Sequence, residues 1–319
     1  MKNIYILVFS FLFLPPIMSM EPDELLFEAI VKGDPKQLEE AINNNANVNA
    51  QDKTGKYASS IFTSKNIDSE GMSAIDFAII KGNPEIVLLL IQNRVNMSND
   101  TFTLALINGS YSIAKLLLKH GNFNVNQIAN DGTTPLWDAA VSGDIGKVTL
   151  LLNRGANYNI TCAPMLLKFL LAKGRSNDNL QEQSLTQQLN LMKSLLADMQ
   201  NSSINPLTVN LERVIQVLIQ FAELAEAVKT NPSQEVLKEA IKNDFSILVK
   251  QLIREGIAFD RSHIELAKLH TSREAGVILY SQLRFIEGSV PNFISSKGIV
   301  GTHNLTKDLA LYVGRLTLD

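Results

Sequence analysis

Short apolar stripes with helical spacing alternate with polar, glycine-containing turns along much of the chain. After Gly143, for example, Val148 is followed by Leu151 and Leu152, three and four residues further on. This spacing places apolar side chains on one face of a helix, which is typical of an amphipathic helix that packs against a neighbour. The pattern predicts a series of short helices, each burying one face.

The stripes and their turns recur together. The segment 82–90 (GNPEIVLLL) reappears, loosely rewritten, at 109–118 and at 143–152, and an earlier copy opens at Gly33. Gly109 and Gly143 lie 34 residues apart, close to the roughly 33 residues of a helix-turn-helix-finger unit. Repetition at this period predicts a solenoid.

The best-preserved unit spans 131–159 and resembles the ankyrin repeat. Its Thr134-Pro135-Leu136 matches the T-P-L of that family and Ala139 matches the family alanine, while Trp137 stands where the family usually has His. Proline suits the first turn of a helix, and Gly143 suits a helix end that a β-carbon would resist. The resemblance implies an all-α ankyrin-repeat solenoid and a surface that holds other proteins.

Four units can be aligned between residues 23 and 159, with two irregular intervals. Gly33 and Gly82 lie 49 residues apart, which predicts a long connecting finger that contains residues 56–68. Gly82 and Gly109 lie only 27 apart, which predicts a shortened finger. Later apolar patterns are helical but lack the T-P-L motif. The predicted organisation is a signal peptide (1–19), ankyrin repeats 1–4 (20–160), an α-helical insertion or degenerate repeat (161–232), a degenerate ankyrin-like repeat pair (233–283), and a C-terminal loop with a capping helix (284–319).

The N-terminus has the features of a secretory signal. Lys2 precedes an apolar run of 11 residues (4–14), then Pro15-Pro16 and a small-residue exit at Ser19. The run is shorter than the roughly 20 residues that span a bilayer. We therefore expect cleavage after Ser19, no stable membrane insertion and a secreted or periplasmic mature chain; an uncleaved anchor is the alternative.

Composition limits the chemistry. The 319 residues are 45% apolar and carry a formal charge of −3, which suits a globular protein and argues against a nucleic-acid binder, because such proteins cluster Lys and Arg. Cys162 is the single cysteine, so no internal disulfide forms; we expect it to be a buried hydrophobe rather than a nucleophile. The histidines fit no metal motif, although two of them could share a helix face, and we expect no cofactor and no metal. They are His120, His263, His270 and His303.

The resemblance implies a non-catalytic protein–protein interaction scaffold, monomeric, whose first helices and finger tips bind a protein client. Trp137 is the strongest contact candidate because Trp dominates interface hot spots, and packing within the fingers is its alternative role. Two roles fit an exported scaffold, an effector of a host-associated bacterium or a periplasmic partner of an exported enzyme. An enzyme or toxin-like activity in 161–232 or 284–319 is the alternative function. The residues expected to face the client are Asp52, Lys53, Thr54, Ser69, Glu70, Met72, Asn130, Asp131, Thr133, Trp137 and Asp138.

Overall fold

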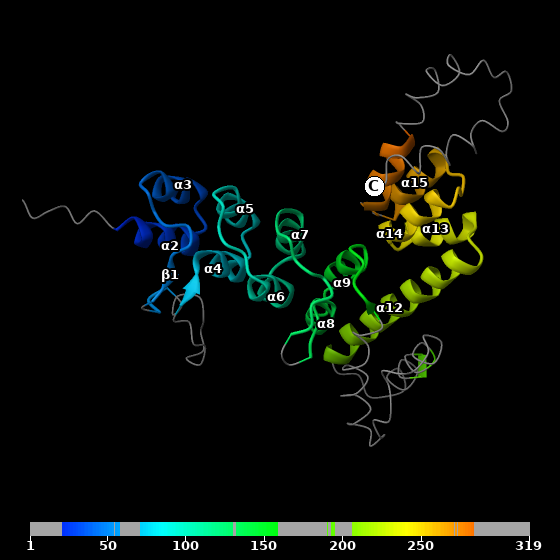
Figure 1. Ribbon diagram of the computed structural model, residues 1–319, viewed down its shortest axis with the longest axis horizontal. Coiled ribbons are helices and arrows are strands. Elements are labelled where there is room, and N and C mark those ends of the chain that lie inside the picture. The colour runs from blue at the N-terminus through cyan, green and yellow to red at the C-terminus, as the bar shows by residue number, and fades with distance from the viewer. Residues whose placement is uncertain are drawn as a thin grey trace, which may run out of the picture. The chain divides into compact units, whose positions relative to one another are not determined.

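The computed structural model describes residues 21–53, 55–57, 71–129, 132–158, 190, 193–194, 206–270, 272 and 274–283. The predictions about the signal peptide (1–19), Cys162, His303 and the segment 284–319 lie outside these residues. The chain divides into two compact units, residues 1–123 and 124–319, and each is described by itself (Figure 1).

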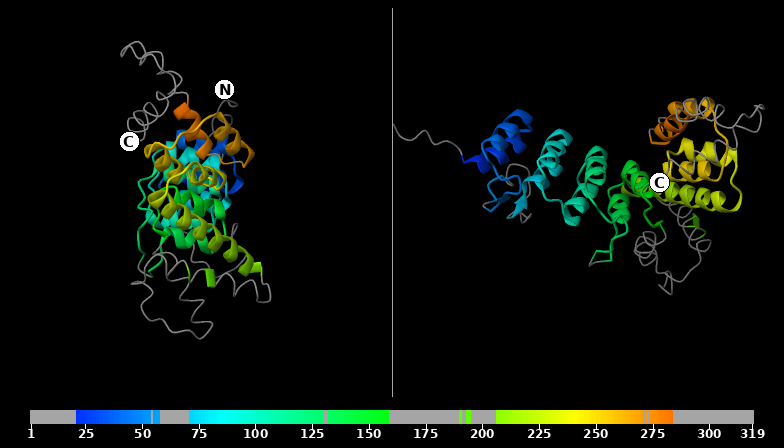
Figure 2. Two further views of the ribbon diagram at one scale, coloured as in Figure 1. Left: turned by 90° about the vertical axis from the view of Figure 1, so that its right-hand side faces the viewer. Right: turned by 45° about the horizontal axis from the view of Figure 1, so that its top comes forward.

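The first unit consists of three helix pairs. The first helices of the pairs, α2, α4 and α6, pack against one another, and so do the second helices, α3, α5 and α7. The two rows are visible in Figure 1 and in the right-hand view of Figure 2. The pairs are α2 (Pro22–Lys32) with α3 (Pro35–Asn43), α4 (Ala74–Lys81) with α5 (Pro84–Gln92), and α6 (Asn99–Ile107) with α7 (Tyr111–His120).

The turn inside each of the first two pairs follows from a glycine, a polar residue and a proline. Gly33 and Gly82 both have φ +70°, a left-handed conformation that L-residues resist. After Gly82, the Asn83 side chain accepts hydrogen bonds from the first backbone N–H groups of α5, so it caps that helix. Its amide nitrogen also donates to the carbonyl of Gly33 at 3.4 Å. One asparagine therefore caps its own helix and ties its turn to that of the preceding pair.

The core of the first unit lies between the two rows of helices. Alanines at one repeat position of α2, α4 and α6 have no exposed surface, which lets neighbouring first helices pack closely. Larger aliphatic and aromatic side chains fill the remaining space. The fully buried residues include Leu26, Ala29, Leu38, Ile75, Phe77, Ala78, Ile86, Leu90, Ala105, Ile113 and Leu117.

The connection between the first and second pairs is a finger with a small antiparallel ladder. Strand β1 (Gln51–Asp52) pairs with β2 (Met72–Ser73), with Gln51 opposite Ser73. The long interval that the glycine spacing predicts falls between these strands. The connection from α5 to α6 is much shorter, and Asn96 in it donates its backbone N–H to Oδ1 of Asn49 at 2.7 Å.

The second unit begins with one more pair, α8 (Pro135–Val141) and α9 (Ile145–Leu152). The long helix α12 (Pro206–Thr230) contacts this pair and also the next, α13 (Gln234–Lys242) with α14 (Ser246–Arg254). Phe221 of α12 packs edge-on against Phe245, with ring centroids 5.0 Å apart. Helix α15 (Arg261–Leu269) and a helical segment at 274–283 follow.

Asp244 takes the place of the turn glycine between α13 and α14. Its φ is +54°, and short polar side chains are among the few that tolerate this conformation. Its carbonyl accepts a hydrogen bond from Nδ2 of Asn153 at 2.8 Å, and its Oδ1 accepts one from the N–H of Ala275 at 2.8 Å. This turn therefore joins the end of α9 to the last helical segment.

Within the described residues, no helix is both long enough and apolar enough to cross a membrane.

Candidate protein-binding surface

The first helices start at capped turns that hold their exposed faces in place. In α4, the Ser73 hydroxyl accepts a hydrogen bond from the N–H of Asp76 at 3.4 Å, and the Asp76 carboxylate accepts one from the N–H of Ser73 at 3.3 Å. This is a capping box. In α8, the Thr134 hydroxyl accepts a hydrogen bond from the N–H of Trp137 at 3.2 Å. Trp137 therefore sits in the first turn of a rigidly started helix.

Aliphatic side chains recur at the exposed end of the first helices. In the first unit, Val31, Ile80 and Ile107 each stand two residues before the glycine of their turn. Val31 and Ile80 are partly exposed, and 46% of Ile107 is exposed. The same repeat position in the second unit is Val141, which is 60% exposed. Most core aliphatics of these helices are almost fully buried, so this position is distinct.

A cleft of about 460 Å³ lies at the base of the finger in the first unit, between α2 and the segment 47–57. Tyr57 stacks on Phe27 with ring centroids 5.3 Å apart, and its hydroxyl donates to the carbonyl of Glu24 at 3.3 Å. Lys56 pairs with the Glu24 carboxylate at 3.2 Å, and this hydrogen bond raises the pKa of Lys56. These contacts attach the start of the long finger to α2.

The residues expected to face a client in the first unit have different environments. Lys53 is exposed and Met72 is partly exposed. Asp52 is only 3% exposed, and its Oδ2 accepts a hydrogen bond from the N–H of Tyr57 at 2.9 Å. The expectation that Asp52 faces a partner needs correction, because its carboxylate is used inside the finger. Thr54, Ser69 and Glu70 lie outside the described residues.

The second unit also separates exposed from buried candidates. Thr133 and Trp137 are partly exposed, whereas Asp138 is only 8% exposed and offers almost no surface to a partner. Sequence reasoning missed Val141, one helical turn beyond Trp137, and Ile128, which is 58% exposed in the preceding finger. Asn130 and Asp131 lie outside the described residues.

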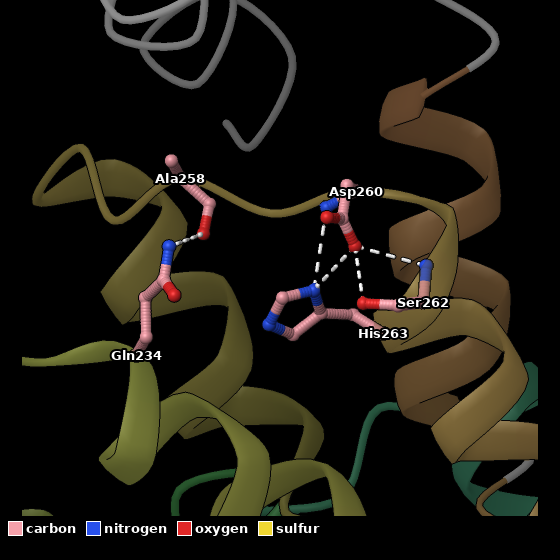
Figure 3. A network of polar contacts seen from close by, with 5 residues as sticks. All are labelled: Gln234, Ala258, Asp260, Ser262 and His263. Carbon is pink, nitrogen blue, oxygen red and sulfur yellow. Dashed lines mark hydrogen bonds and ion pairs between the residues drawn. The ribbon is translucent and has the colours of Figure 1, made fainter.

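The polar cluster at the start of α15 has a structural explanation (Figure 3). His263 is buried, and its Nδ1 lies 3.0 Å from Oδ1 of Asp260, the residue that caps the helix. Hydrogen bonds from Ser262 and from His263 lower the pKa of Asp260 to about 2. His270 is exposed at the other end of α15, so His263 and His270 do not share an environment. Among the described residues, no group of three or more His, Cys, Asp or Glu side chains could hold a metal ion.

Residues 75–162 match the family model for ankyrin repeats, in three copies. This part of the chain belongs to the ankyrin-repeat family. The match covers α4 to α9, while α2, α3 and the helices from α12 onward lie outside it. No curated protein matches the sequence. Ankyrin repeats are protein–protein interaction modules and are generally not enzymes.

Proposed function

We propose that this ankyrin-repeat protein is a non-catalytic scaffold that binds a client protein through the exposed face of its first helices and the bases of its fingers. The observation that carries the proposal is the recurrence of exposed or partly exposed aliphatic residues at one repeat position, Val31, Ile80 and Ile107 in the first unit and Val141 in the second. Exposed apolar side chains gathered on one face mark interaction sites, because they gain free energy when a partner removes them from water.

In the second unit, Trp137 and Val141 are the proposed anchors. They lie four residues apart on α8, and side chains at that spacing share a helix face. Trp137 combines a large apolar ring with a polar N–H, a combination that is enriched in interface hot spots. Thr133 and the finger before it supply the polar rim in this proposal.

The binding test begins with affinity capture by the mature protein from a periplasmic extract and from a host-cell lysate, followed by titration of the purified client. We expect Trp137→Ala to weaken the client by about tenfold or more, with unchanged helical content, because truncating a central anchor removes buried contact area. His270→Ala, at the exposed end of α15, is the control and should bind like the wild type. Unchanged affinity in a folded Trp137→Ala protein would contradict the proposal for this face.

Export is the second part of the proposal. The short apolar run before Ser19 supports cleavage by a signal peptidase, and the mature chain then acts as a secreted effector or as a periplasmic partner. Intact-mass measurement of the protein from the culture medium and periplasm should give a chain that starts after Ser19. A mass that retains Met1 would contradict export by cleavage. The extract that yields the client separates the two roles.

A further inference from the structure

The first unit carries a continuous row of aliphatic side chains on its first helices. Helices α2, α4 and α6 pack side by side, and Val31, Ile80 and Ile107 occupy the same position in each. Residues at one repeat position of stacked helices are neighbours across the stack. The row therefore crosses three helices, with Ile107 as its most exposed member at 46%.

Charges of opposite sign lie along the two edges of this row. Lys32 and Lys81 immediately follow Val31 and Ile80, and both are exposed in the last turns of their helices. The other edge carries carboxylates in the first turns of the same three helices, namely Glu24, Asp76 and Asp100. A partner with an apolar centre and two flanks of opposite charge would match this surface.

The spacing of the row selects the conformation of that partner. Packed helices lie about 8–10 Å apart, so successive aliphatic side chains of the row repeat at about that distance. Seven residues of an α-helix rise about 10.5 Å and return to nearly the same face. Residues on one face of a β-strand repeat at about 7 or 13 Å instead, which does not match. A helix can therefore place one apolar side chain against each member of the row.

We infer that the first unit binds an amphipathic α-helix of the client, laid across α2, α4 and α6. The helix has apolar residues at every seventh position over at least about 15 residues, which spans three positions of the row. Its acidic flank lies along Lys32 and Lys81, and its basic flank lies along the carboxylates. This inference rests on the proposed function and names the partner chemistry for one of the two units.

A designed peptide tests the inference without the client. The probe is a fluorescent, capped peptide of about 18 residues with leucine at every seventh position, Glu on one flank and Lys on the other. The control has the same composition with the leucines spread around the helix. By fluorescence anisotropy at low salt, we expect the full chain to bind the probe at least about tenfold more tightly than the control peptide. Equal affinity for both peptides would overturn the inference.

Substitutions locate the binding. We expect Ile107→Asp to weaken the probe about tenfold and Lys81→Glu to weaken it about threefold at low salt, with a smaller effect at high salt. Lys119→Glu, an exposed lysine in the last turn of α7, is the matched control and should bind like the wild type. Both tested positions are exposed, so folding should persist, which circular dichroism checks. Unchanged binding by Ile107→Asp and Lys81→Glu would overturn the inference.

The client experiment separates this inference from the proposed function. If the probe does not bind but the client is weakened by Trp137→Ala, the amphipathic-helix inference is wrong and the scaffold function stands. If the probe does not bind and the client also ignores Trp137→Ala, both are wrong.

Discussion

Substitution of Gly82 tests the repeat frame most cleanly, because this glycine ends α4 with φ +70° and ψ 23°. A β-carbon built there meets no atom within 4 Å, so the cost is conformational and not steric. The left-handed conformation costs an L-residue about 1–2 kcal/mol. Replacing glycine also restricts the unfolded chain, which returns about 0.4–1 kcal/mol. We therefore expect Gly82→Ala to destabilise the first unit by about 0.5–1.5 kcal/mol.

A series at this position makes the expectation specific. Gly82→Asn should cost less than Gly82→Ala, because asparagine tolerates the left-handed region, and Gly82→Val should cost most, because it is β-branched. Native-state hydrogen exchange of peptides from α4 and α5 measures the change locally, and urea unfolding measures it globally. Arg94→Gly is the control, since Arg94 already has φ +61° and the two effects of that substitution nearly cancel. Equal stability of all three Gly82 variants and the wild type would refute the assigned turn.

Three further predictions concern single side chains. Phe77 is fully buried and packs edge-on against Phe27 at 5.5 Å, so Phe77→Ala should lower the free energy of unfolding by about 3–5 kcal/mol in urea titration; a loss below about 1 kcal/mol would contradict that packing. Burial lowers the pKa of Lys147 below its usual 10.5 despite Asp144 at 3.8 Å, so the unfolded chain binds the extra proton and wild-type stability should rise as pH approaches 10.5. Lys147→Met should remove that rise, which thermal melts across pH check, and an unchanged slope would contradict it. The pKa of Asp260 is lowered to about 2, so its contribution is present above its usual 3.8 and is lost as pH falls through about 2; hydrogen exchange in α15 should show this acid loss in the wild type and not in Asp260→Asn.

The turns of the helix pairs could be read from the sequence because their determinants are local. Gly33 and Gly82 are each followed by a capping residue and a proline, and this order has few other structural explanations. The contact between Asn153 and Asp244 could not be read in the same way. These residues lie 91 positions apart, and no periodic signal connects them across the intervening segment.

The candidate surface was only partly predictable. Asp52 looked like an exposed finger residue, but the backbone N–H that binds its carboxylate belongs to Tyr57, inside the long finger, where the family pattern gives no guidance. Val141 was missed because an aliphatic residue in a helix is usually assigned to the core. It lies outside the buried face marked by Leu136 and Ala139, and comparison with Ile107 at the same repeat position could have identified it.

Site-specific photo-crosslinking tests the central claim, binding through the first helices, most directly. A photoreactive amino acid replaces Ile107, Val141 or Lys119, one at a time, in protein expressed with its natural N-terminus, and adducts are identified by mass spectrometry. We predict that positions 107 and 141 crosslink to a discrete client protein and that position 119, on a second helix, does not. Adducts from position 119 alone, or equal adducts from all three positions, would contradict the account.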